Sequence, residues 1–249
     1  MTVAVVLPVL LAAMFLLPNV WWSIALVAPL LVAGHEWARL ADFARGAEAA
    51  FLTALLAGSV LLWLIAPERA VFALAVAFWC VIVPCWLWLK LVVRQRLALA
   101  AAGLAVLLPA WLALARLQHD AGLLLRLLAV VWIADSAAYF TGRALGRHKL
   151  APAISPGKTW EGVGGAFAAV IAYALALHFS LFAARDLPRV IAGFVSMVAL
   201  GILGDLLESW LKRCAGVKDS GGIFPGHGGM LDRIDGVTAA LPLAALIFV

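Results

Sequence analysis

Charged residues are scarce in this chain, because Asp, Glu, Lys and Arg together make up only 12% of its 249 residues. Soluble domains carry about 25% charged residues, so this scarcity excludes an ordinary soluble fold. Hydrophobic residues account for 66% of the chain, in runs long enough to cross the hydrocarbon core of a bilayer. The composition therefore indicates a helical membrane protein that crosses the bilayer several times.

Cysteine is nearly absent as well, which excludes a disulfide framework and argues against a zinc site. The three cysteines are Cys80, Cys85 and Cys214, and no two of them form a C-x-x-C pair. We therefore expect free, buried thiols. The first apolar stretch lacks a basic segment and a small-residue cleavage site, so we expect it to be retained rather than removed as a signal peptide.

Apolar segments recur along the whole chain and predict an all-α, polytopic membrane fold with roughly nine transmembrane helices and short polar cytoplasmic loops. They lie near residues 3–17, 19–34, 49–66, 70–92, 97–115, 122–141, 161–183, 188–208 and 234–249. Only Pro18-Asn19 separates the first two, so one span or two both remain open. We interpret the chain as one membrane unit in which residues 1–120 form a mainly lipid-facing scaffold and residues 121–249 carry the catalytic loops.

Basic residues are concentrated in alternate loops of this arrangement. Loops after the second, fourth, sixth and eighth segments hold most of the 18 Lys and Arg residues. By the positive-inside rule these loops are cytoplasmic, and the two most polar ones, residues 142–160 and 209–233, then share one side. We expect an integral protein of a bacterial inner membrane, with its active site facing the cytoplasm.

The segment GDLLESWLKR, residues 204–213, carries a polar stripe at the end of a span. Asp205, Glu208, Ser209 and Lys212 are spaced so that they share one helix face. Acids in such a place are costly unless they face protein, water or a metal. For Glu208 the alternative is a structural ion pair with Lys212, four residues further on.

The segment KDSGGIFPGHGGMLDRID, residues 218–235, combines glycines with charged residues. Glycines allow close approach of the backbone, whose successive N–H groups cradle phosphate oxygens. Lys218 and His227 add positive charge or hydrogen bonds. Asp232 and Asp235 follow at the start of the last helix, and carboxylates beside a phosphate site suit a bridging Mg²⁺. The alternative, a plain turn, does not account for this combination.

The other polar loop, ISPGKTWEG at residues 154–162, supplies a cation and two hydroxyls around a Pro-Gly turn. Lys158, Ser155 and Thr159 are candidates to contact an anionic ligand. Thr159 also suits the N-cap of the following helix, and the two roles are compatible because helix N-termini bind anions. Upstream, Asp135 lies inside a span, which makes it either a functional residue or half of an internal ion pair.

The segment GHEWARLADFAR, residues 34–45, has the pattern of an amphipathic helix lying in the membrane interface. His35 and Glu36 are then either contacts for a ligand or residues in solvent or among lipid headgroups, and this interpretation favours the second.

Two of these segments together resemble a known signature. The stretch from Ser209 to Asp235, S-W-L-K-R-x4-K-D-S-G-G-I-F-P-G-H-G-G-M-L-D-R-I-D, resembles that of phosphatidate cytidylyltransferases (CDP-diacylglycerol synthases), as does the stretch from Asp135 to Gly162. The likeness covers the C-terminal half of the chain. It implies transfer of the cytidylyl group of CTP to phosphatidic acid with release of pyrophosphate, a multi-helix membrane fold and commonly a homodimer.

The resemblance also implies a site with Mg²⁺, leaving open a second metal or a monovalent cation. It aligns Asp205 and Asp232 with the metal-holding acids, with Ser209 and Asp235 as further candidates, and Lys212 and Arg213 join the catalytic set. The substrate-binding candidates are Ser155, Lys158, Thr159, Lys218, Asp219, His227, Gly228, Gly229 and Arg233. The expected partners are CTP, phosphatidic acid and the bilayer, with no nucleic acid. Two rival functions remain, a CTP-dependent lipid kinase of the polyprenol type and a membrane transporter.

Overall fold

Helices make up most of the computed structural model, which describes residues 2–65, 67–180, 187–223 and 228–249. The helices are α1 (Thr2–Leu16), α2 (Asn19–Ala25), α3 (Val27–Leu40), α4 (Arg45–Ile65), α5 (Glu68–Ala77), the π-helix η1 (Phe78–Ile82), α6 (Val83–Trp88), α7 (Arg96–Leu117), the 3-10 turn η2 (Gln118–Asp120), α8 (Ala121–Leu145), α9 (Trp160–Ser180), α10 (Leu187–Cys214) and α11 (Leu231–Phe248). Two short strands, β1 (Lys149–Ala151) and β2 (Ser155–Thr159), form the remaining regular structure in these ranges.

Six stretches of the described chain are long and apolar enough to span a membrane. The longest, residues 96–145, consists of α7 and α8 joined by the turn η2. The prediction of a polytopic helical membrane protein is thereby confirmed. The first two predicted segments are separate helices, because α1 ends at Leu16 and α2 begins at Asn19, beyond Pro18.

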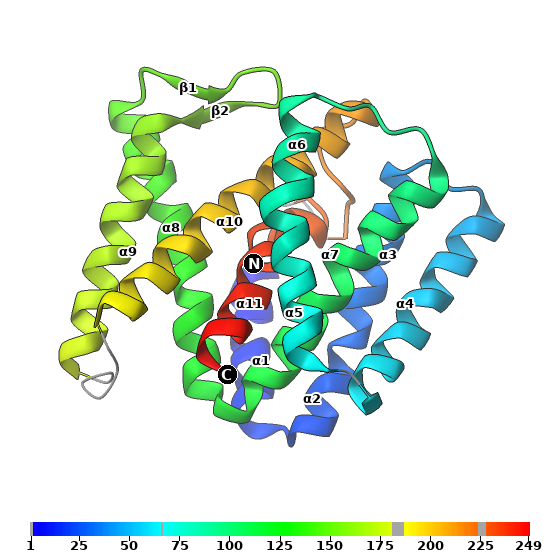
Figure 1. Ribbon diagram of the computed structural model, residues 1–249, viewed down its shortest axis with the longest axis horizontal. Coiled ribbons are helices and arrows are strands. Elements are labelled where there is room, and N and C mark those ends of the chain that lie inside the picture. The colour runs from blue at the N-terminus through cyan, green and yellow to red at the C-terminus, as the bar shows by residue number, and fades with distance from the viewer. Residues whose placement is uncertain (1, 66, 181–186, 224–227) are drawn as a thin grey trace.

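The last helix, α11, lies in the middle of the molecule rather than at its edge (Figure 1). It packs most extensively against α10, and also against α5, α7 and α8. Ala239, Ala240, Leu241 and Ala244 are fully buried. Small residues in the middle of α11, such as Ala239, Ala240 and Ala244, allow its neighbours to pack closely around it.

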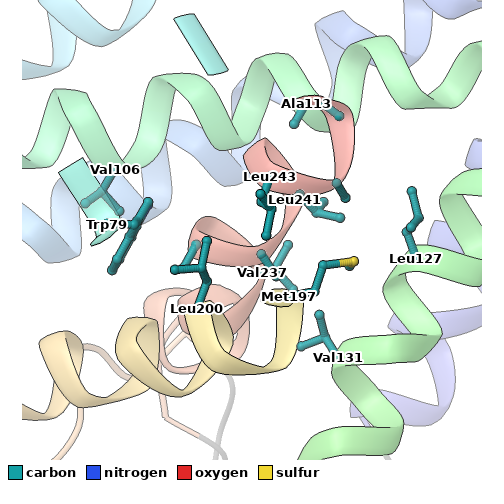
Figure 2. Packing of buried hydrophobic residues seen from close by; sticks show 14 of the residues in the cluster. Trp79, Val106, Ala113, Leu127, Val131, Met197, Leu200, Val237, Leu241 and Leu243 are labelled. Atoms are coloured by element: carbon teal, nitrogen blue, oxygen red, sulfur yellow. The ribbon is translucent and has the colours of Figure 1, made fainter. Parts of the chain in front are cut away.

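The packing around α11 draws on both halves of the chain (Figure 2). The surrounding side chains are Trp79 of η1, Val106 and Ala113 of α7, Leu127 and Val131 of α8, and Met197 and Leu200 of α10. Helices from residues 1–120 therefore pack directly against the last helix of the chain.

A crossing of α10 and α11 sets the position of the polar residues on both helices. At Gly204 an added Cβ would lie 3.0 Å from the carbonyl carbon of Asp235 and 3.3 Å from the Cβ of Ala239. Small residues allow helix backbones to approach this closely in membrane proteins. The crossing therefore brings Asp205, next in sequence, to the first turns of α11.

A β-hairpin occupies the region where the sequence predicted a short polar loop. Strands β1 and β2 pair antiparallel, with Lys149 opposite Thr159 and Ala151 opposite Ser155. Thr159 ends β2, is 4% exposed, and accepts a hydrogen bond from the backbone N–H of Gly162 at 3.1 Å. Its predicted role as N-cap of α9 is confirmed. In Figure 1 the hairpin lies at one end of the molecule, beyond the ends of α8 and α9.

The prediction of an interfacial amphipathic segment at residues 34–45 is wrong in its placement of Glu36, which is buried. Helix α3 continues to Leu40, and Glu36, Trp37 and Ala38 are 2%, 3% and 1% exposed. The indole N–H of Trp37 donates to the carbonyl of Leu99 at 2.9 Å. Contacts with neighbouring helices bury this face, so Glu36 does not lie in solvent. Its neighbour His35 remains half exposed and pairs with Glu48 on α4.

The three cysteines are free, as predicted, but they are exposed on the surface of the chain rather than buried in its core.

Candidate active site

Asp205 connects two of the polar segments identified in the sequence, residues 204–213 and residues 154–162. Its Oδ2 lies 2.6 Å from the Nζ of Lys158, which the hairpin carries across to α10. Its Oδ1 accepts a hydrogen bond from the hydroxyl of Ser209 at 3.2 Å. The predicted shared face of Asp205 and Ser209 is confirmed, and Asp205 on this face also binds the ammonium group of Lys158.

Two more carboxylates surround this ion pair. Asp135 of α8 and Asp235 of α11 each interact electrostatically with Asp205 and with Lys158. Three acids from three helices therefore interact electrostatically with one ammonium group, and Asp205 is the one in direct contact with it. Such a surplus of negative charge attracts a further cation, and carboxylate oxygens are the ligands that Mg²⁺ takes. Within the part of the chain that the structure describes, however, no three His, Cys, Asp or Glu side chains form a ready metal site.

Asp232 lies in a second group of charges, centred on Lys212. The Nζ of Lys212 is 2.5 Å from Oδ1 of Asp232 and 2.9 Å from Oε2 of Glu208. Both acids and the lysine are largely buried. The structural pair of Glu208 with Lys212, one of the two alternatives from the sequence, is thus present, and Lys212 also ties α10 to α11.

The second oxygen of Asp232 is used entirely by the preceding loop. Oδ2 accepts hydrogen bonds from the backbone N–H groups of Ser220 at 3.0 Å and Gly229 at 2.7 Å, and from the Ser220 hydroxyl at 2.9 Å. Asp232 lies in the first turn of α11, before the apolar part of that helix. Burial raises its pKa, but the hydrogen bonds from Lys212, Gly229 and Ser220 outweigh burial and hold the pKa well below its usual value.

The two acids predicted to share one cation are therefore bound to different lysines, Asp205 to Lys158 and Asp232 to Lys212. Asp235, the other acid at the start of α11, interacts electrostatically with Asp205 in this arrangement. A shared cation between Asp205 and Asp232 stays a prediction.

The remaining candidates have more varied surroundings. Arg213 donates from Nε to the carbonyl of Ile154 at 3.4 Å, which links α10 to the hairpin. Ser155 is partly buried at the start of β2. Lys218, Asp219 and Arg233 are exposed. His227 lies outside the described residues.

Gly228 and Gly229 contact the chain's own carboxylates. Gly228 has φ +81°, a conformation that favours glycine, and a Cβ there would lie 2.6 Å from Oδ2 of Asp232. A Cβ at Gly229 would lie 2.5 Å from Oε2 of Glu36. In this structure the backbone at these glycines therefore lies close to the carboxylates of Asp232 and Glu36.

Two residues of the site were missed or underrated from the sequence. Asp135 was recognised as an acid inside a span, but without a partner. Glu36 was assigned to solvent or lipid headgroups, although Trp37 and Ala38 follow it directly in the same helix. That setting was the available signal, because an acid surrounded by apolar residues needs donors from elsewhere in the protein.

Comparisons with known proteins agree with these motifs. The model of the cytidylyltransferase family matches residues 1–249. A phosphatidate cytidylyltransferase of Pseudomonas aeruginosa is 39% identical over 257 aligned positions, which cover 99% of this chain and 94% of that protein. Matches to the same enzymes of Haemophilus influenzae and Bacillus subtilis reach 50% and 49% identity, over 52% and 45% of this chain and 46% and 42% of theirs. These two alignments thus span less than half of the relatives they match.

Proposed function

The chain belongs to the cytidylyltransferase family, and we propose that it transfers the cytidylyl group of CTP to phosphatidic acid, giving CDP-diacylglycerol and pyrophosphate. One observation in the structure carries this proposal. Lys158 of the first motif binds Asp205, four residues before the second motif begins, and Asp135 of the first motif and Asp235 of the second interact electrostatically with both. Both motifs of the resemblance therefore contribute to a single polar cluster.

The reaction is an in-line displacement at the α-phosphorus of CTP. An oxygen of the phosphatidate phosphate forms the new bond to phosphorus, and the bond to the pyrophosphate leaving group breaks. A phosphate monoester is largely a dianion at neutral pH because its second pKa is about 6. The nucleophile therefore needs no strong general base, and the main obstacle is repulsion between two anions.

The chain's own cations reduce that repulsion. Lys158 is partly exposed in the cluster, and Lys218 and Arg233 are exposed on the neighbouring loop and helix. We assign these residues to the phosphates of CTP and of the lipid. Lys212 already holds two acids, and Arg213 holds the hairpin. Their part in catalysis is therefore to position Asp232 and Lys158.

Mg²⁺ is the cofactor we propose for this cluster. Its predicted ligands, Asp205, Ser209, Asp232 and Asp235, supply only oxygen atoms, which suits a hard cation. Asp205 and Asp235 interact with each other, and Ser209 contacts Asp205, so these three are the best placed. A cation bound there supplies positive charge to the reacting phosphates.

We place the cluster on the cytoplasmic side of a bacterial inner membrane, where water-soluble CTP enters while the acyl chains of the lipid stay in hydrocarbon. The excess of Lys and Arg in the loops that carry the cluster supports this orientation. In this arrangement α7 and α8 cross the membrane separately. Together with α1, α11 and the other five apolar stretches, they give roughly nine membrane helices. The homodimer implied by the resemblance stays a prediction.

The position of a radioactive label tests the reaction. With CTP labelled at the α-phosphate, we expect label in the lipid and release of one pyrophosphate for each lipid formed. A lipid kinase would instead leave this label on CDP. A transporter would release no pyrophosphate from CTP and phosphatidate. Either of these results would contradict the proposed function.

A further inference from the structure

A buried carboxylate from the N-terminal half holds the glycine-rich loop together. Glu36 on α3 is 2% exposed. Its Oε1 accepts a hydrogen bond from the backbone N–H of Met230 at 2.9 Å, and its Oε2 accepts from the N–H of Leu231 at 2.8 Å. Oε2 also lies 2.9 Å from the hydroxyl oxygen of Ser220, whose one proton is shared between Glu36 and Asp232. One side chain therefore binds both ends of the loop and the first N–H groups of α11.

The glycines of the loop leave space for this carboxylate. The three atoms nearest to a Cβ built at Gly221 all belong to Glu36, with Cδ at 2.7 Å and Cγ at 3.1 Å. Gly221 has no positive φ, so its backbone conformation does not require glycine. A Cβ at the adjacent Gly222 meets no atom within 4 Å. Space for Glu36 is the reason for glycine at position 221.

Glu36 is also connected to the acids of the site. The Ser220 hydroxyl lies 2.9 Å from Oε2 of Glu36 and 2.9 Å from Oδ2 of Asp232. The helix that starts at Leu231 carries both Asp232 and Asp235. Any displacement of the start of α11 therefore moves two of the predicted metal ligands. An anionic side chain at a helix N-terminus also interacts favourably with the helix dipole.

We propose that Glu36 is a positioning residue for cytidylyl transfer, which holds the start of α11 and with it Asp232 and Asp235 in their working places. This inference rests on the proposed function. Glu36 is buried and acts through the loop rather than on a reactant. Misplacement of a reacting group by about 1 Å costs about 100-fold in rate. Loss of Glu36 should therefore lower kcat strongly and change the KM for CTP little.

A double-mutant cycle tests the proposal in the full-length protein. We expect Glu36→Ala to lower kcat by roughly 10- to 100-fold, with the KM for CTP within about threefold of the parent value. Gly221→Ala should lower kcat similarly, because the new methyl group displaces the Glu36 carboxylate from its donors. The double variant should lose no more than either single variant. The matched control, Gly222→Ala, should keep the parent kcat.

Losses that multiply in the double variant would overturn the proposal, because Gly221 would then act independently of Glu36. A Gly222→Ala variant as impaired as Gly221→Ala would overturn it as well. If Glu36→Ala does not fold, Gly221→Ala and Glu36→Gln decide the question. The glutamine keeps one carbonyl acceptor, so its kcat should lie between those of Glu36→Ala and the parent, and a parent-like kcat would count against the proposal.

Hydrogen exchange separates this inference from the proposed function, because it needs no turnover. The amides of Met230 and Leu231 should exchange faster in Glu36→Ala and Gly221→Ala than in the parent, and at the parent rate in Gly222→Ala. If the parent protein releases no pyrophosphate, the proposed function fails, while exchange still reports whether Glu36 holds the loop. Unchanged exchange in both variants would refute that role.

Discussion

Lys158 and Asp205 form the contact on which the chemistry of the site depends. The ammonium group and the carboxylate are 2.6 Å apart, and their side chains are 23% and 36% exposed. A partly exposed ion pair of this kind is screened by solvent and makes only a modest contribution to folding stability. Its two members should therefore be replaceable without unfolding, so that their loss reports on function.

At the residue scale, Asp205→Asn is expected to lower kcat by at least about 100-fold, because the neutral amide removes one charge from a site that depends on electrostatic stabilisation. The melting temperature in detergent should stay close to the parent value. Asp232→Asn should abolish turnover as well and also lower the melting temperature, since its amide cannot satisfy Lys212 and the three donors on Oδ2.

Steady-state kinetics and thermal unfolding of the same preparations check both expectations. Glu48→Gln on α4, outside the cluster, is the control and should behave like the parent protein. Near-parental turnover in Asp205→Asn or Asp232→Asn would refute the metal assignment.

A second prediction concerns Lys158. Lys158→Ala should raise the KM for CTP more than the KM for phosphatidate, because we assign its charge to the triphosphate. Lys149→Ala, which removes an exposed lysine from the same hairpin, should leave both constants near the parent values. Initial rates over a grid of both substrate concentrations give the two constants. A larger rise in the KM for phosphatidate would move Lys158 to the lipid side of the site.

At the scale of elements, the crossing of α10 and α11 depends on glycine. A Cβ at Gly204 approaches the backbone of Asp235, and backbone atoms cannot move aside as the end of a side chain can. Separation of the two helices would weaken their packing and also shift Asp205 relative to Asp235. The same contact therefore serves both stability and the site.

Gly204→Ala tests this crossing. We expect a lower melting temperature and a lower kcat, because the helices must move apart to accommodate the methyl group. Gly164→Ala in α9 is the matched control, since a Cβ there meets nothing within 4 Å. That substitution should be neutral or stabilising by up to about 1 kcal/mol, from the higher helix propensity of alanine. Equal effects of the two substitutions would show that the close approach at Gly204 is unimportant.

The hairpin is the element that the sequence failed to predict. Its strands have only three and five residues, and Pro156-Gly157 indicates only a turn. Contacts with other elements accompany the pairing: Thr159 is buried against α9, and Arg213 of α10 donates to Ile154 between the strands. Strand propensity is a property of the local sequence, so it cannot reveal a hairpin that is stabilised by contacts with other helices.

At the scale of the whole molecule, the polar cluster and the excess of basic residues belong to the same set of loops. We therefore expect the hairpin and the turn between α7 and α8 to lie on opposite sides of the membrane. Gly157 is in the hairpin, with open space around it, and His119 is exposed in η2. These two positions suit labelling with a thiol reagent that cannot cross the membrane.

In a variant with Cys80, Cys85 and Cys214 replaced by serine, Gly157→Cys should react in inside-out vesicles and not in intact cells after outer-membrane permeabilisation. His119→Cys should react with the opposite preference. The physical reason is the retention of Lys- and Arg-rich loops in the cytoplasm. Labelling of both positions from the same side would contradict the proposed orientation.

The sequence by itself determined the membrane class, the polar face of α10, the N-cap at Thr159 and the family. These features depend on composition, helical spacing and local motifs, which are complete within short stretches of chain. Only the tertiary structure decided that α11 lies at the centre, that Asp205 binds Lys158 while Asp232 binds Lys212, and that Glu36 holds the loop from 195 positions before Leu231. Ion pairs and buried hydrogen bonds between distant residues depend on which helices touch, and apolar helices of similar composition carry little information about their neighbours.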